Sequence, residues 1–189
     1  ASSYLAYGFT GTLALIVLFT AIFSTISIIE DRHAGFLQGV LVAPVGRSAI
    51  VFGKVLGSST LAVAQALLFL MLGPLMGITF SPASLLTTVV VLILLSVALS
   101  ALGFVIAWSM DSAQGFHAVM NLFLIPMWLL SGAFFPAGGA SSWLQPVIAL
   151  NPLTYGVAAL RHAVHLASGS PSVTTPSVGV SWAVTIGFG

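Results

Sequence analysis

Four long, predominantly apolar runs set the limits on how this chain can fold. They cover residues 5–29, 49–78, 85–108 and 118–135, and a fifth begins at residue 178. A helix needs about 20 apolar residues to cross the hydrocarbon layer of a bilayer. Strands of a membrane barrel would alternate apolar and polar residues, and these runs do not. Because backbone groups in lipid must be paired within their own segment, the runs predict an all-α, polytopic helix bundle.

Composition supports a membrane protein and excludes several other classes. Only 4% of the 189 residues are charged and 59% are hydrophobic, whereas a soluble domain carries about 25% charged residues. The net charge of +1 gives no electrostatic reason to expect a nucleic-acid partner. The absence of cysteine excludes disulfides and thiolate metal sites. The chain begins without Met and stops inside the fifth run, so we expect a single transmembrane domain, residues 1–189, that is a fragment of a longer protein.

The polar segment between the first two runs, residues 30–48, forms an elbow. Five of the seven charged residues (four Lys or Arg and three Asp or Glu in all) lie in it or just after it: Glu30, Asp31, Arg32, Arg47 and Lys54. Charge in hydrocarbon is costly, so the elbow lies in water on one side of the membrane. Cytoplasmic loops are enriched in Lys and Arg, which predicts a cytoplasmic elbow. The region 136–177, with Arg161 and two short apolar pieces, is then external, and we expect those pieces to be short surface or re-entrant helices.

The elbow has the pattern of a short helix that lies parallel to the membrane. Glu30 and Asp31 are residue types that favour the first turn of a helix. Pro44 ends the helix, because the residue before a proline is pushed out of the helical region. Four apolar residues fall on one face at helical spacing: Phe36, Leu37, Val40 and Leu41. Such a helix either rests on lipid or fits a groove in a cytoplasmic partner and transmits its movement.

Two segments of the sequence carry distinctive motifs. The first is Glu30-Asp31-Arg32-His33-Ala34-Gly35-Phe36-Leu37, followed by Val40-Leu41-Val42-Ala43-Pro44-Val45, Arg47 and Gly53-Lys54. The second is Ser131-Gly132-Ala133-Phe134-Phe135-Pro136, Trp143-Leu144-Gln145, Asn151-Pro152-Leu153-Thr154-Tyr155 and Ala159-Leu160-Arg161. The first resembles the cytoplasmic signature of the permease subunits of type-2 ATP-binding-cassette exporters, and the second is similar to that family's external region. Both signatures occur in order around correctly spaced runs, so the resemblance covers nearly the whole chain.

The resemblance implies a multi-pass protein of the cell inner (plasma) membrane that forms a homodimer or heterodimer of permease copies. It implies a six-span family in which this chain lacks the first span and most of the sixth. It also implies contacts with membrane lipid, a lipophilic or lipid-linked substrate, and separate ATPase subunits that bind ATP and Mg²⁺, so this chain is expected to hold no cofactor and to be no enzyme. The implied ATPase-coupling residues are Glu30, Arg32, Gly35, Phe36, Leu37, Leu41, Pro44 and Arg47.

Polar residues in the runs and in the external region are candidates for the substrate path. Gln65 and Asn121 lie inside runs, and an amide there either finds a partner across a helix interface or lines the path. Arg161 is either exposed to solvent or lipid phosphate, or part of an external gate with the turn from Asn151 to Tyr155.

Two charged residues near the ends of the runs suggest contacts between helices. Lys54 can reach back from the second run to pair with Glu30 or Asp31. Asp111 can cap the helix that leads into the fourth run.

The energy source must lie outside this sequence. No Gly-x-x-x-x-Gly-Lys-Ser/Thr motif is present, so the chain cannot bind ATP by that device. Two alternatives to an exporter permease remain open. An ion-coupled secondary transporter would carry acids inside its spans, whereas the acids here lie at span ends. The other alternative is a membrane assembly protein that transports nothing.

Overall fold

The computed structural model describes residues 2–36, 39, 46–133, 144–165 and 178–188, and the secondary structure in these ranges is helical, without strands. The elements are α1 (Ser2–Phe23), η1 (Ser24–Ile26), α2 (Ser27–His33), α4 (Arg47–Leu70), η2 (Pro74–Met76), α5 (Pro82–Trp108), α6 (Ala113–Leu130), α7 (Gln145–Leu150), α8 (Pro152–His165) and α9 (Val178–Phe188). Four stretches are long and apolar enough to cross a membrane: Tyr7–His33, Arg47–Met76, Pro82–Trp108 and Ala113–Leu130. The predicted all-α, polytopic bundle is confirmed.

The first span runs further than the apolar pattern suggested, and one expectation is wrong. α1, η1 and α2 form one span that ends at His33, so Glu30 and Asp31 lie in the last turns of that span and do not begin a new helix. The helix continues because the Ala34 N–H still donates to the Glu30 carbonyl at 2.9 Å. The Asp31 carboxylate also has a partner at this level, the ammonium of Lys54.

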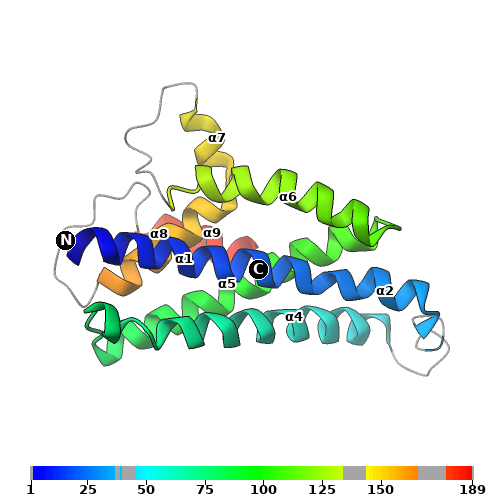
Figure 1. Cartoon of the computed structure of the whole chain (residues 1–189), viewed down its shortest axis with the longest axis horizontal. Helices are drawn as coiled ribbons and strands as arrows, with labels where there is room; N and C mark the ends of the chain where they lie inside the picture. The colour runs from blue at the N-terminus through cyan, green and yellow to red at the C-terminus, as the bar shows by residue number, and fades with distance from the viewer. Residues whose placement is uncertain (1, 37–38, 40–45, 134–143, 166–177, 189) are drawn as a thin grey trace.

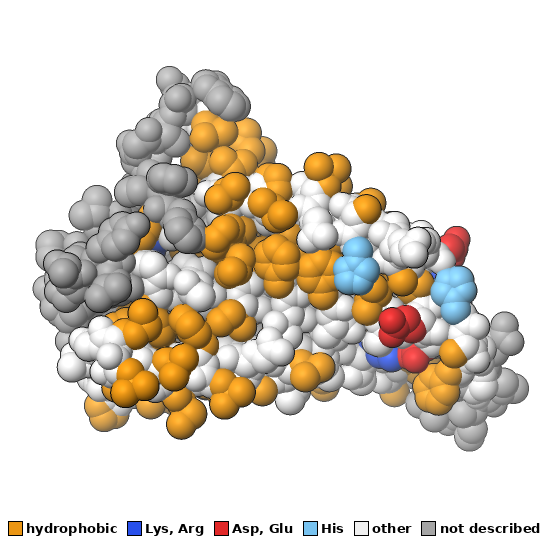
Figure 2. Space-filling view, in the orientation of Figure 1, with side chains coloured by type: hydrophobic (Ala, Val, Ile, Leu, Met, Phe, Trp, Pro, Cys, Tyr) orange, Lys and Arg blue, Asp and Glu red, His pale blue; other side chains and the backbone are white. Residues whose placement is uncertain are grey.

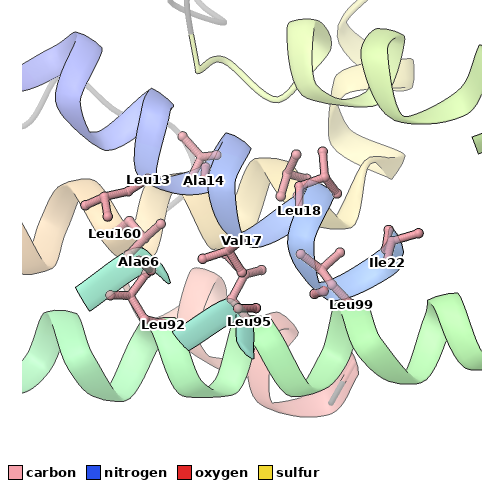
Figure 3. Packing of buried hydrophobic residues seen from close by; sticks show 14 of the residues in the cluster. Leu13, Ala14, Val17, Leu18, Ile22, Ala66, Leu92, Leu95, Leu99 and Leu160 are labelled. Atoms are coloured by element: carbon pink, nitrogen blue, oxygen red, sulfur yellow. The ribbon is translucent and has the colours of Figure 1, made fainter. Parts of the chain in front are cut away.

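The core lies where α1 packs against α4, α5 and α8 (Figure 3). The buried face of α1 repeats at the spacing of a helix: Leu13, Ala14, Val17, Leu18, Ala21 and Ile22. These side chains meet Ala66 of α4, Leu92, Leu95 and Leu99 of α5 and Leu160 of α8. Within lipid such contacts stabilise by close packing, since hydrocarbon outside the bundle is equally apolar.

α6 is the least buried of the four spans. Figure 1 shows α6 along one side of α1 and α4 along the other. Only 17% of the α6 span is buried, against 50% of the span that contains α1. Its buried side chains are Phe116, Met120 and Leu124. α6 therefore presents most of its surface outward from this chain.

Two shorter helices, α7 and α8, lie toward the end of the bundle opposite α2 (Figure 1). α7 and α8 are the two short helices expected there, and α8 packs on α5. The Ser84 hydroxyl of α5 donates to the Ala163 carbonyl of α8 at 2.8 Å. Close approach is possible because Gly156 faces Leu95, where a Cβ would lie 2.6 Å from the leucine Cδ1.

Candidate functional site

Charged side chains gather at one end of the molecule (Figure 2). This charged end consists of Asp31 and Arg32 on α2, Lys54 on α4 and Asp111 just before α6. Lys54 forms an ion pair with Asp31 and also donates to the Ser27 hydroxyl at 3.3 Å. Of the two carboxylates considered for Lys54, the structure selects Asp31, and the pair joins α2 to α4.

Arg32 binds the connection between α5 and α6. Its Nη1 atom lies 2.9 Å from the Asp111 carboxylate, and its Nη2 atom donates to the Trp108 carbonyl at 2.8 Å. A longer bond of 3.3 Å reaches the Met110 carbonyl, and the guanidinium carbon lies 5.4 Å from the centroid of the Trp108 ring. The last carbonyls of a helix lack partners within it and carry partial negative charge, so a cation there is favourable. Arg32 thus caps α5 from a different helix.

The neighbouring His33 and the start of α6 complete this contact. His33 Nε2 lies 2.6 Å from the Asp111 carbonyl, and since a carbonyl only accepts, Nε2 carries the proton. The expectation that Asp111 caps α6 is wrong. The cap is Ser112, whose hydroxyl accepts from the Gly115 N–H at 3.2 Å. The Asp111 side chain instead faces the Arg32 guanidinium, a stronger partner for a carboxylate than a backbone N–H.

Beyond α2 the described part of the elbow is exposed. Gly35 has φ +73°, a left-handed conformation that favours glycine, and Phe36 follows it with 62% of its surface exposed. Glu30 and Arg47 are also exposed. Leu37, Leu41 and Pro44, and the predicted amphipathic helix with them, lie outside the described residues. Arg32 differs from these residues, because its side chain is bound within the chain.

Gln65 and Asn121 differ in their contacts. The Thr20 hydroxyl of α1 donates to the Gln65 Oε1 atom of α4 at 2.6 Å, so Gln65 joins two helices while remaining exposed. Asn121 is exposed on α6, and its side chain makes no hydrogen bond to the described residues. An amide without a partner is costly in hydrocarbon, which favours a polar or protein-covered environment for this face of α6.

At the opposite end, Arg161 is buried, with 6% of its surface exposed. Its guanidinium carbon lies 3.8 Å from the centroid of the Tyr7 ring, and its Nη2 atom donates to the carbonyls of Gly132 and Ala133 at 2.5 and 3.2 Å. The Tyr7 hydroxyl donates to the same Gly132 carbonyl at 2.7 Å. The interpretation of Arg161 as a solvent-exposed or lipid-facing residue is therefore wrong. The arginine binds carbonyls just beyond the last turn of α6, where a cation is favourable.

Asn151 binds the same end of α6, whereas the hydrogen bond of Tyr155 lies within its own turn. The Asn151 Nδ2 atom donates to the Met127 carbonyl at 2.6 Å, and its Oδ1 atom accepts from the Leu153 N–H at 3.0 Å. The Asn151 side chain therefore caps α8 and, at the same time, donates a hydrogen bond to a carbonyl of α6. The Tyr155 hydroxyl donates instead to the Ala149 carbonyl at 2.9 Å, within its own turn.

Sequence reasoning missed the partners at both ends. Trp108 offers a backbone carbonyl and a ring to Arg32, and Tyr7 and Gly132 bind Arg161. Backbone carbonyls leave no signal in a sequence. Asp111 is a signal that the sequence does contain, since a lone acid between two apolar runs needs a cation or water nearby.

The chain matches the family model described as ABC-2 type transporter over residues 2–165. This chain belongs to the ABC-2 type transporter family. It is 30% identical over 162 residues to the putative transport permease ycf38 of Cyanophora paradoxa, covering 85% of this chain and 56% of that protein. It is 26% identical over 179 residues to the probable doxorubicin resistance ABC transporter permease protein DrrC of Mycobacterium tuberculosis, covering 92% of this chain and 63% of that protein. The chain thus spans between about half and two thirds of the length of these relatives.

Membership of the ABC-2 type transporter family confirms the resemblance found in the sequence. It confirms, at the level of the family, a transmembrane permease subunit of an ABC transporter. Permease subunits of this kind are generally not catalytic themselves. The family favours this function over an ion-coupled transporter and over an assembly protein.

Proposed function

We propose that this chain, paired with a second permease copy, forms the substrate path of an ATP-driven exporter in the plasma membrane. A separate cassette ATPase binds ATP and Mg²⁺ and docks on the elbow, which faces the cytoplasm. The substrate is lipophilic or lipid-linked. The name of the Mycobacterium relative, a doxorubicin resistance permease, supports an apolar drug-like substrate class.

The observation that carries the docking proposal is the position of Phe36. This aromatic side chain is 62% exposed immediately after the positive-φ turn at Gly35, beside the charged end. An exposed aromatic residue bordered by charge is typical of an anchor that inserts into a pocket of a partner. Glu30 and Arg47 are exposed on the same elbow. We include them in the docking surface, together with Leu37, Leu41 and Pro44.

The outward face of α6 supports the proposed path. α6 is little buried within this chain and carries the exposed amide of Asn121, which suits a water-filled cavity between two copies. Gln65 is the second candidate on this path, because its amide is exposed beside Thr20. Arg161 and Asn151 both bind the end of α6 away from the charged end. We propose them as the residues that keep the external side closed.

The test uses two phenylalanines of matched exposure. Phe36→Ala and Phe36→Asp should lower co-purification of the ATPase while leaving membrane insertion intact. Phe52→Ala is the control, because Phe52 is 64% exposed on α4, close to the elbow in sequence. Transport is measured in proteoliposomes with doxorubicin and with a fluorescent phospholipid as probes. Undiminished ATPase binding by both Phe36 variants would reject the docking role.

A further inference from the structure

We propose that Arg32 is a positioning residue that passes movement of the elbow to α6 through Asp111, and that it does not itself dock the ATPase. This inference rests on the proposed function, in which a partner moves the elbow. It concerns four contacts between the end of α2 and the α5–α6 connection, all of them among described residues.

Two consecutive residues of α2 bind two different parts of the bundle. Asp31 pairs with Lys54 of α4, and Arg32 pairs with Asp111 of the α5–α6 connection. The elbow begins at these residues and leads into α4 at Arg47. A displacement of the elbow therefore acts on α4 through the chain itself, but it can reach α6 at this end only through contacts in space.

The contacts of Arg32 have the geometry of a rigid link. An isolated ion pair would be weak here, since the Asp111 side chain is 90% exposed. Arg32 adds bonds to the carbonyls of Trp108 and Met110 and lies over the Trp108 ring. The planar, five-donor guanidinium can serve these acceptors together, which a lysine cannot. His33 binds the Asp111 backbone from the same turn of α2.

α6 is suited to respond to this link. Its N-cap, Ser112, directly follows Asp111 in the chain, so a shift of Asp111 displaces the first turn of α6 directly. Along its length α6 is only 17% buried. Between its ends it contacts α1 through rings such as Phe23 and His117, which stack with centroids 5.0 Å apart. Its other end is bound by Asn151, while Arg161 binds the carbonyls just beyond it. A helix that is bound at its two ends and leaves most of its surface outside the bundle of this chain has room to tilt.

The experiment measures the movement of α6 directly and needs no knowledge of the substrate. Spin labels are placed at Leu61→Cys on α4 and Leu122→Cys on α6, both exposed positions in a sequence without cysteine. Labelled chain is diluted with unlabelled chain and assembled with the ATPase. The distance between labels is then recorded with and without ATP and vanadate. The parent complex should show a shift in this distance on trapping. Arg32→Ala should lower the ratio of shifted to unshifted complexes about fivefold or more, because the coupling between the elbow and α6 is lost.

Further variants separate a relay from a structural contact. Asp111→Asn keeps the size of an exposed side chain and should also reduce the shift, and Arg32→Lys should restore only part of it. Gln114→Ala, in the first turn of α6 and exposed, should leave the shift unchanged. ATPase co-purification and ATP hydrolysis should persist in the complexes of all of these variants. If the parent chain itself failed to bind the ATPase or to support ATP hydrolysis, that result would contradict the proposed function. A full shift in Arg32→Ala, or no shift in a parent that hydrolyses ATP, would overturn the relay.

Discussion

The Tyr7 hydroxyl and the Arg161 guanidinium converge on one oxygen atom, the carbonyl of Gly132, at 2.7 and 2.5 Å. Tyr7 lies near the start of α1, Arg161 near the end of α8, and Gly132 just beyond α6. Three segments distant in sequence are therefore joined at a single backbone group. Gly132 has φ +78°, which turns this carbonyl region away from the helix axis and suits glycine.

The first prediction concerns this junction. Tyr7→Phe removes one neutral hydrogen bond and should lower the free energy of unfolding by about 1 kcal/mol. Arg161→Met should cost more, about 2–4 kcal/mol, because it removes a charged donor from the carbonyls of Gly132 and Ala133 and also removes the contact with the Tyr7 ring, leaving only the Tyr7 hydroxyl on Gly132. Thermal unfolding in detergent measures both. Equal melting temperatures for Arg161→Met and the parent would show that the arginine does not join these segments in solution.

The second prediction compares two glycines of α1. A Cβ on Gly11 would lie 2.6 Å from the Ala133 carbonyl oxygen, a backbone atom that cannot rotate away, whereas nothing lies within 4 Å of the Cβ position of Gly8. Gly11→Ala should therefore destabilise the protein by about 1–3 kcal/mol. Gly8→Ala should be neutral or stabilise by up to about 1 kcal/mol, since alanine favours a helix. The two melting temperatures should shift in opposite directions or differ clearly; a matched shift would contradict the close approach of α1 to Ala133.

The length of the four long apolar runs predicted the helical type and approximate extent of the four spans found among the described residues, because a membrane imposes length and internal hydrogen bonding on every crossing segment. The partners of the charged residues were harder to predict. Lys54 had two acids within reach in sequence, and only the folded arrangement of α2 and α4 selects Asp31. The sequence marks Arg161 as a candidate residue, but its burial depends on Tyr7, more than 150 residues earlier in the chain.

The third prediction tests whether Gln65 acts as a structural contact or as a path residue. Thr20→Val and Gln65→Leu each remove the 2.6 Å hydrogen bond between α1 and α4, and a bond of this kind in a membrane protein contributes about 0.6 kcal/mol. In a double-mutant cycle, the losses of unfolding free energy measured for the two single variants should not add in the double variant. Thr60→Val is the control, because that hydroxyl bonds only to the Leu56 carbonyl of its own helix. Changed transport in Gln65→Leu with normal transport in Thr20→Val would assign Gln65 to the path.

The last prediction concerns the outward face of α6. Asn121 and Leu122 are neighbours and both are exposed, yet they point in directions about 100° apart around the helix. If Asn121 lines a water-filled cavity, Asn121→Cys should react with a charged, membrane-impermeant thiol reagent, and Leu122→Cys should react far more slowly from lipid. The sequence has no cysteine, so each introduced thiol is the only one it contains. Trapping with ATP and vanadate should change the rate of thiol modification at position 121, because alternating access opens the cavity to the other side of the membrane. Equal, ATP-independent rates at both positions would place Asn121 outside the path and leave its amide to be covered by a neighbouring protein surface.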